Sequence, residues 1–309
     1  MMTRRSFPAL KLSATSLGAL VGVLCLAGAT AAHAAGPGNA ARGAVIFAAG
    51  DCVGCHTDLK AKTAPLSGGA PMPTDFGVFY APNITSDKVH GLGAWTEAEF
   101  KRAMREGKGK GGEFLYPVFP YPAFSGMSDQ DISDLWAFMK TVPASNRASK
   151  AHETKFPFGM RPLLIGWRVM FFHKGPLAPV AGKSAEWNRG RYLAEAVAHC
   201  GECHSPRNKL GGIDEKNAYA GNPAGPDNQN APNITQHKDG IGSWSVGEIE
   251  EILNSGGKPD GDYIGGGMGL VVEGTAKLSA ADRKAIAVYV KSLEARASTP
   301  KPAAAAKKG

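Results

Sequence analysis

A Cys-x-x-Cys-His string occurs twice in this sequence, at residues 52–56 and again at residues 200–204. Two thiols one short turn apart can each add to a vinyl group of one porphyrin, and the adjacent histidine then supplies an axial nitrogen to the iron. A zinc site leaves both trailing histidines unexplained, and a thioredoxin-like dithiol requires a βαβ pattern that we do not find. The strings therefore predict two covalently bound haem c groups. The predicted attachment residues are Cys52, Cys55, Cys200 and Cys203, and the predicted proximal ligands are His56 and His204.

Each iron then has one remaining coordination position, opposite its histidine. A methionine in that position raises the reduction potential and closes the iron to other ligands. Met268 is the only methionine after His204, and its Gly-rich surroundings are flexible enough to bring sulfur to iron. Met127 lies in a loop just before the last predicted helix of the first half. We therefore predict Met127 and Met268 as the sixth ligands. The other candidates in the first half, on predicted helices or soon after the string, are Met72, Met104 and Met139.

The first 34 residues have the pattern of a secretory signal peptide. Arg4 and Arg5 precede an apolar run from Leu17 to Ala32, and the predicted cleavage follows Ala34. This run is too short and too rich in Ala and Gly to predict a permanent membrane span. Cys25 leaves with the signal, so the mature chain keeps only the four cysteines of the two strings. We predict a periplasmic protein, because haem is attached covalently outside the cytoplasm.

Composition limits the classes of function. The net charge of +8 falls to about +2 for the predicted folded part, since three basic residues lie in the signal peptide and three in the C-terminal tail. The sequence has no basic stripe interleaved with aromatic residues, so it gives no support to nucleic-acid binding. With 40 Gly and 21 Pro in 309 residues, it favours loop-rich domains that wrap around a large apolar cofactor.

The two halves share several motifs in the same order, which predicts a duplicated domain. An Arg-Gly pair precedes each string, and an Ala-Pro-Asn-Ile-Thr motif and a Gly-x-Gly-x-Trp motif follow it. These motifs are Arg42–Gly43 and Arg189–Gly190, Ala81–Thr85 and Ala231–Thr235, and Gly91–Thr96 and Gly240–Ser245.

The predicted helices also repeat. One precedes each string, at about residues 39–48 and 186–198. Capping boxes at Thr96 and Ser245 begin a second pair, and an apolar i, i+3, i+4, i+7 pattern follows Ser128 and Ser279. No convincing alternating strand pattern occurs, so we predict an all-α fold. The predicted organisation is a signal peptide (1–34), a first haem domain (35–143), a linker (144–183), a second haem domain (184–296) and a disordered tail (297–309).

The predicted linker contains an apolar run from Leu163 to Phe172. We favour an amphipathic helix that packs against both domains, because polar residues interrupt the run. The alternative is docking on a membrane or on a partner protein, since Arg161, Arg168 and Lys174 accompany the apolar side chains.

Several longer motifs carry a resemblance to a known family. The chain resembles class I cytochromes c, and more narrowly the cytochrome c subunits of bacterial membrane-associated dehydrogenases for alcohols, aldehydes and sugar acids. Those subunits usually have three haem domains and a C-terminal membrane-anchoring portion, whereas this chain has two haem strings. The motifs are Ala81–Thr85, Leu115–Pro117, Tyr121–Pro122, Trp187–Gly190 and Cys203–Asn208.

The resemblance implies two tandem class I cytochrome c domains in an electron-transfer subunit. Its donor would be a quinoprotein, flavoprotein or molybdopterin dehydrogenase, and its acceptor a quinone, an oxidase or a soluble cytochrome, with peripheral association to the inner membrane left open. The alternative is a dihaem enzyme. A peroxidase needs an iron that opens, and a thiosulfate dehydrogenase uses a cysteine ligand that the predicted mature chain lacks. We therefore expect a non-catalytic subunit of an oxidoreductase complex.

Overall fold

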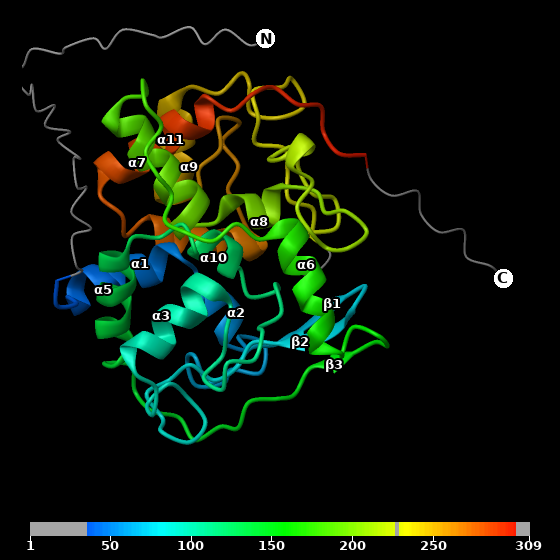
Figure 1. The fold of residues 1–309 in the computed structure, drawn as a ribbon. Coiled ribbons are helices and arrows are strands. Elements are labelled where there is room, and N and C mark those ends of the chain that lie inside the picture. Colours follow the sequence, from blue (N-terminus) through cyan, green and yellow to red (C-terminus); the bar gives the residue numbers. More distant parts are fainter. Residues whose placement is uncertain (1–35, 226–228, 301–309) are drawn as a thin grey trace, which may run out of the picture. The chain divides into compact units, whose positions relative to one another are not determined.

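The computed structural model describes residues 36–225 and 229–300, whose regular secondary structure is mostly helical and includes one small sheet (Figure 1). The predicted signal peptide and residues 301–309 of the predicted tail lie outside the described residues. Within the described part, no helix combines the length and the apolar character needed to cross a membrane. Thr299, in the predicted tail, donates its backbone N–H to Ala220 O at 3.0 Å.

Each half contains the predicted helices, and we refer to the halves as the first repeat (36–143) and the second repeat (184–296). The first repeat contains α1 (Ala40–Ala49), α2 (Cys52–His56), α3 (Glu97–Glu106), α4 (Tyr121–Phe124) and α5 (Asp129–Met139). The second contains α7 (Ala185–Tyr192), the π-helical turn η2 (Leu193–Val197), α8 (Cys200–His204), the 3-10 turn η3 (Glu215–Asn217), α9 (Val246–Ser255), α10 (Gly266–Thr275) and α11 (Ala280–Lys291).

The predicted caps position these helices. Thr96 and Ser245 each form a reciprocal capping box with the glutamate three residues later, at the starts of α3 and α9. Ser128 caps α5 and Ser279 caps α11. Each serine side chain accepts a hydrogen bond from the backbone N–H of the aspartate three residues later. The sequence predictions for these four helix starts are confirmed.

The first and last helices of each repeat pack at very short range, and glycine makes this contact possible. A Cβ atom placed on Gly43 of α1 would lie 1.9 Å from the backbone oxygen of Asp134 on α5. A Cβ atom on Gly190 of α7 would lie 1.8 Å from the backbone oxygen of Ala285 on α11. The Arg-Gly pair seen in both halves of the sequence therefore marks the point at which two backbones meet.

The arginine of the first pair reinforces this contact. Arg42 donates from Nε and Nη2 to the Asp134 carboxylate at 2.6 and 2.9 Å. Burial of Asp134 favours its neutral form, but hydrogen bonds from Arg42, the Asn39 N–H and Gln130 outweigh this effect and lower its pKa. In the second repeat, Arg189 makes the corresponding bidentate contact with Asp282.

We call the helix that precedes each string the leading helix of its repeat. The second repeat has one extra residue between the Arg-Gly pair of this helix and the string. Cys52 follows Arg42 by ten residues, whereas Cys200 follows Arg189 by eleven. The extra residue is accommodated in η2, where the Ala198 N–H donates to the oxygen of the residue five positions earlier, at 2.7 Å. A π-helical turn of this kind absorbs one residue without breaking the helix.

The small sheet was not predicted from the sequence. It consists of β1 (Pro71–Thr74), β2 (Gly77–Tyr80) and β3 (Glu153–Thr154), all antiparallel in the order β1-β2-β3. The first two strands have only four residues each, and prolines at two positions in β1 remove ladder donors, so the sequence has no clear strand signal. Phe79 of β2 anchors the sheet in a satellite core with Tyr116 and Leu164.

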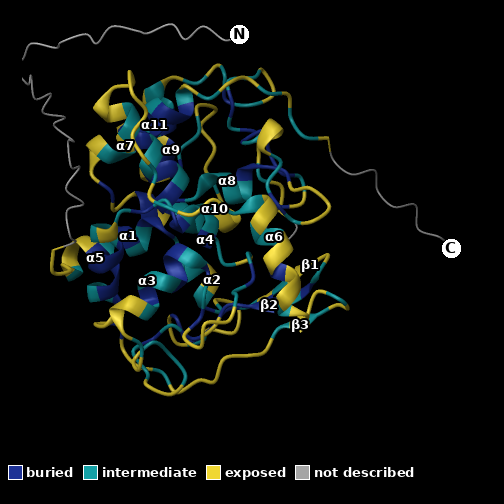
Figure 2. Cartoon of the chain, viewed as in Figure 1, coloured by how far each residue is buried: buried dark blue, intermediate teal, exposed yellow. Residues whose placement is uncertain are grey.

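The linker forms the 3-10 turn η1 (Arg161–Leu163) and helix α6 (Leu164–Phe171), and it contacts both repeats. Arg161 donates to Phe114 O in the first repeat. Trp167 Nε1 donates to Leu210 O in the second repeat at 3.0 Å. The favoured sequence interpretation, a helix packed against both domains, is confirmed, although much of α6 remains exposed (Figure 2).

The two repeats share one hydrophobic core. Ile46 and Trp136 of the first repeat belong to the same buried cluster as Leu193 and Ile286 of the second. Helix α10 of the second repeat packs on α1 of the first, and α4 of the first packs on η2 of the second. Each repeat therefore supports the helix that leads into the other repeat's string.

We expect Gly43→Ala and Gly190→Ala to destabilise the protein, because the new methyl group would overlap a backbone oxygen that cannot move without separating the helices. Overpacking of this kind costs about 1–3 kcal/mol or more. The measurement is the thermal unfolding midpoint of the haem-loaded protein. Gly166→Ala is the control, since no atom lies within 4 Å of the new Cβ on exposed α6. An unchanged midpoint in both core variants would contradict this account of the helix contact.

Candidate functional site

Both strings form a single helical turn, α2 and α8, directly after the leading helix of the repeat. The chain reverses into each turn through a left-handed residue, Asp51 (φ 46°) or His199 (φ 41°). Asp51 also caps its turn by accepting from Gly54 N at 3.2 Å. Helical geometry places cysteines three positions apart on one face of the turn, which is the arrangement needed to bond two vinyl groups of one porphyrin.

The two histidines predicted as proximal ligands are held in the tautomer that an iron requires. Nδ1 of His56 donates to Pro82 O at 2.7 Å, and Nδ1 of His204 donates to Pro232 O at 2.7 Å. Since a carbonyl can only accept, the proton is on Nδ1 and the lone pair on Nε2 is available for a metal. Desolvation lowers the pKa of both imidazoles, which also favours the neutral form.

The repeated Ala-Pro-Asn-Ile-Thr motif explains how these carbonyls are positioned. Its proline supplies the acceptor, and its asparagine is buried directly after it. Asn83 donates to Ser145 O and Arg147 O, both at 2.8 Å, and accepts from the Thr85 N–H at 2.9 Å. Asn83 therefore ties the loop that holds the histidine to the segment after the last helix of the repeat.

The second copy of the motif makes the same connection with different partners. Asn233 donates to Arg296 O at 2.7 Å and accepts from the Thr235 N–H at 2.8 Å. Both asparagines are almost fully buried, with 2% of Asn83 and 4% of Asn233 exposed. The proximal loops are therefore held by satisfied buried amides rather than by surface turns.

Three of the four string cysteines have the environment of residues that face an apolar cofactor, whereas Cys55 is exposed. Burial raises the pKa of the Cys52 and Cys200 thiols to about 12 and that of Cys203 to about 11. Thiols of this kind are not poised for redox or nucleophilic chemistry at neutral pH. The donor set fits a haem c in each repeat: two cysteines for the thioethers and one neutral histidine for the iron. A bound haem supplies one-electron redox chemistry.

The two predicted sulfur ligands have different surroundings. Met268 was expected in a flexible loop but lies in the first turn of α10, where it is half-buried. The glycines of this segment disfavour a helix, and packing of α10 against α1 and α9 compensates. Met127 lies between α4 and α5 and is 1% exposed, as part of the shared core.

The two strings lie next to each other. His199, directly before the second string, contacts Gly50, two residues before the first string, with 3.2 Å between Nε2 and the backbone oxygen. The His199 ring also lies edge-on against Phe124 of α4, with the centroids 5.2 Å apart. Its place at the junction of the repeats has no local sequence signal, because it depends on how the halves pack.

Comparison with known proteins agrees with this geometry. The model of the cytochrome c family matches residues 40–143 and 188–294. A diheme cytochrome c-type protein of Cereibacter sphaeroides is 43% identical over 266 residues, which cover 84% of this chain and 87% of that protein. The cytochrome c subunit of gluconate 2-dehydrogenase from Pantoea cypripedii is 38% identical, covering 82% of this chain and 59% of that protein.

A third relative is a subunit of nicotinate dehydrogenase from Pseudomonas putida, which is 39% identical over 82% of this chain and 21% of its own length. The chain therefore spans most of the diheme relative but less than two thirds of these two dehydrogenase subunits. Each region matched by the family model contains one string and the carbonyl that orients its histidine. The chain belongs to the cytochrome c family, with two cytochrome c domains in tandem and one haem c in each.

Proposed function

We propose that this protein is a dihaem electron-transfer subunit that takes electrons from a catalytic dehydrogenase and passes them to the respiratory chain. The observation that carries the proposal is the contact between the segments that lead into the two strings, in which His199 meets Gly50 at 3.2 Å. Because tunnelling rates fall steeply with distance between cofactors, haems attached on either side of this contact are suited to exchange electrons. The names of the relatives, cytochrome subunits of dehydrogenases, support the same role.

The donor in this proposal is a quinoprotein, flavoprotein or molybdopterin dehydrogenase that oxidises an alcohol, an aldehyde or a related small substrate. The gluconate and nicotinate dehydrogenase relatives support a partner of this kind. The acceptor is a quinone, an oxidase or a soluble cytochrome. The signal-peptide pattern of residues 1–34 supports a periplasmic location for this exchange.

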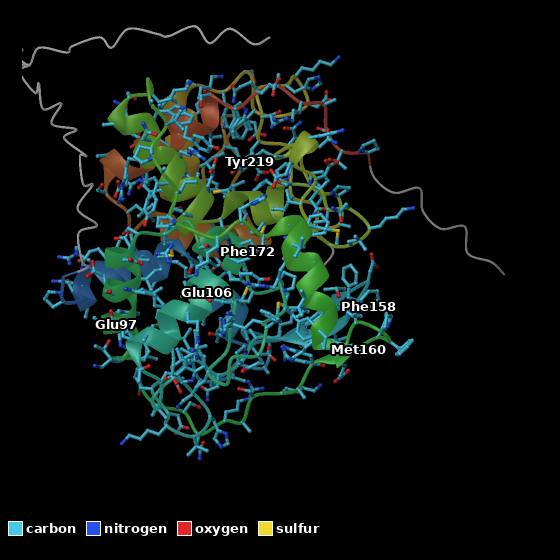
Figure 3. All side chains as sticks on the ribbon, in the orientation of Figure 1. Glu97, Glu106, Phe158, Met160, Phe172 and Tyr219 are labelled. Atoms are coloured by element: carbon cyan, nitrogen blue, oxygen red, sulfur yellow. The ribbon has the colours of Figure 1, made fainter. Side chains whose placement is uncertain are left out.

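The exposed face of α6 is the surface that we assign to the dehydrogenase. Ile165, Val169 and Met170 are 53%, 80% and 53% exposed. Ile165 and Val169 lie four positions apart, which places them on one side of the helix, and Met170 directly follows Val169. Phe158 and Met160 lie near one end of this helix (Figure 3). An apolar face of this kind on a member of a complex suits a protein interface.

The basic residues of the linker favour a protein partner over a membrane. The guanidinium of Arg168 stacks over the Phe172 ring at 4.5 Å, and that of Arg161 over the Tyr116 ring at 4.7 Å. Lys174 is paired with Glu106 at 2.7 Å. Two of these charges stack on aromatic rings and the third, on the half-exposed Lys174, is paired with a carboxylate. They therefore do not form the free basic rim that binds anionic lipids.

We expect Met268→Ala to leave both haems attached, because thioether bonds do not involve the sixth ligand, and to lower the potential of the second haem. The decrease should be on the order of 0.1 V or more, within the ~0.8 V range that axial ligands set. Potentiometric titration of the purified protein checks this, and Met160→Ala, on the exposed linker, is the control. Equal potentials in wild type and Met268→Ala would place the ligand elsewhere.

We expect the double variant Ile165→Glu, Val169→Glu to weaken binding of the dehydrogenase by roughly tenfold or more, because two carboxylates would enter an apolar interface. The measurement is the rate at which the purified partner dehydrogenase reduces the haems of this protein, with increasing cytochrome concentration. Val89→Glu, at a residue 82% exposed in the first repeat, is the control. Loss of vesicle binding with an unchanged reduction rate would instead assign this face to the membrane.

A further inference from the structure

The segments predicted to carry the sixth ligands, which we call the distal segments, can be aligned because each follows a hairpin of the same kind. Helix α3 ends at Gly107 and α9 ends at Gly256, both in the left-handed conformation. The N–H of Leu115 returns to Gly107 O at 2.8 Å, and that of Ile264 returns to Gly256 O at 2.8 Å. The hairpins have the same length, so Leu115 and Ile264 are equivalent residues.

Counted from the aligned residues Leu115 and Ile264, the position that Met268 holds in the second repeat is held by an aromatic residue in the first repeat. Met268 follows Ile264 by four residues, and Phe119 follows Leu115 by four. Both side chains are half-buried, Met268 in the first turn of α10 and Phe119 two residues before α4 begins. Phe119 is therefore the counterpart of Met268, and a phenyl ring offers no donor to an iron.

Alignment from the other end assigns Met127 a different counterpart. Met127 directly precedes Ser128, the cap of α5, and Leu278 directly precedes Ser279, the cap of α11. The N–H of each donates at 3.0 Å to the residue three positions earlier. Met127 is 1% exposed and Leu278 is 3% exposed. Leucine and methionine have similar volumes, so one core position is filled by either.

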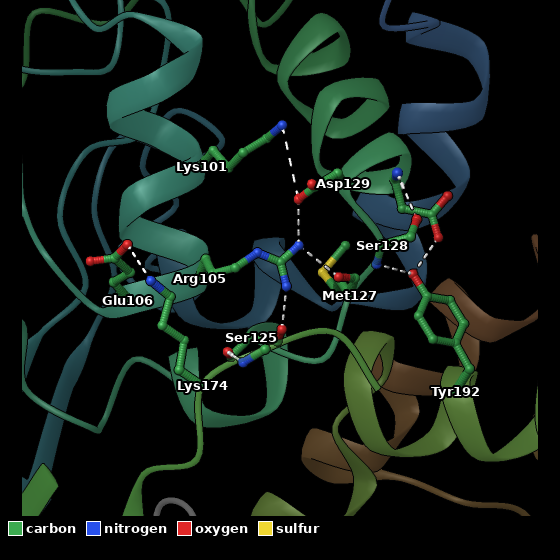
Figure 4. A network of polar contacts seen from close by, with 11 residues as sticks. Lys101, Arg105, Glu106, Ser125, Met127, Ser128, Asp129, Lys174 and Tyr192 are labelled. Atoms are coloured by element: carbon green, nitrogen blue, oxygen red, sulfur yellow. Dashed lines mark hydrogen bonds and ion pairs between the residues drawn. The ribbon is translucent and has the colours of Figure 1, made fainter. Parts of the chain in front are cut away.

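The backbone around Met127 is also fixed on both sides (Figure 4). Buried Arg105 of α3 donates to Ser125 O at 2.5 Å and to Met127 O at 2.8 Å. The hydroxyl of Tyr192, from the second repeat, accepts the N–H of Ser128 at 3.0 Å. These contacts hold Met127 at the junction of the repeats, as part of the core that joins them.

We propose that the first haem has no protein ligand in its sixth position, and that its iron binds small neutral diatomic molecules beside Phe119. An iron with one histidine ligand is open to such ligands, and the polarity of the distal pocket decides which of them bind. Phe119 has no hydrogen-bonding group, so an apolar diatomic is favoured over peroxide. The second haem, with Met268, stays closed. The two haems of one duplicated scaffold are therefore chemically unequal.

The first test uses the wild-type protein with both haems attached and carbon monoxide as the probe. We expect the reduced protein to bind carbon monoxide at one of its two haems. We also expect the oxidised protein to show the weak far-red absorption of methionine-bound iron at the intensity of one haem. Two methionine-ligated haems, or two low-spin haems with no carbon monoxide binding, would overturn the proposal.

Two variants locate the open iron. Met127→Leu copies the residue of the second repeat, so it should fold and leave both the far-red absorption and the carbon monoxide stoichiometry unchanged. Phe119→Met should add a second far-red component and abolish carbon monoxide binding. If Met127→Leu instead removes a far-red component or creates a new carbon monoxide site, Met127 is the ligand and the proposal fails.

The result is separable from the proposed electron-transfer role. The inference depends on haem attachment in both domains but not on any particular partner. Reduction of both haems by the dehydrogenase, measured in the same Met127→Leu preparation, tests the transfer function alone. Failure of that reduction with one haem still binding carbon monoxide would contradict the proposed function and leave the open iron in place.

Discussion

The close contact between the first and last helices is the constraint on which the rest of each domain depends. Glycine at positions 43 and 190 lets two backbones meet where any side chain would overlap a carbonyl oxygen. Each string begins shortly after that contact, on the same continuous stretch of chain. The position of this helix contact therefore sets the position of the cysteines and the histidine of the string. The bidentate arginine–aspartate pairs at the same place oppose separation of the helices.

The proximal side is alike in the two domains in geometry as well as in sequence. His56 and His204 make the same 2.7 Å bond to a proline carbonyl, and a buried asparagine follows that proline in both copies. An axial histidine must present one unprotonated nitrogen in one orientation. That requirement allows little variation, which explains why a five-residue motif is recognisable in both halves.

The distal side and the junction differ between the repeats. Helix α4 has four residues where α10 has ten, and each packs against the leading helix of the other repeat. The π-helical turn before the second string accommodates one extra residue at the same junction. Residues on the distal side therefore both cover a haem and join the domains. Different side chains do this in the two repeats.

The sequence by itself determined the number of haems, the duplication and most helix boundaries, and it predicted the proximal ligands, because these features depend on local spacing. A Cys-x-x-Cys-His string, a capping box or an apolar stripe is complete within about ten residues. The sequence did not reveal the small sheet, whose short proline-containing strands depend on pairing with the distant linker. It also placed Met268 in a loop, since the glycines around it become helical only through packing on α1 and α9.

Only the tertiary structure decided which residues of the two repeats correspond on the distal side. From the sequence, Met127 and Met268 formed a natural pair, as loop methionines at similar distances from their strings. The hairpin hydrogen bonds align Ile264 with Leu115, which makes Phe119 the counterpart of Met268 four residues later, and the last helix caps align Met127 with Leu278. The physical reason is that register after a long loop is set by backbone hydrogen bonds and packing. Counting residues from the string cannot recover that register where the two loops differ in length.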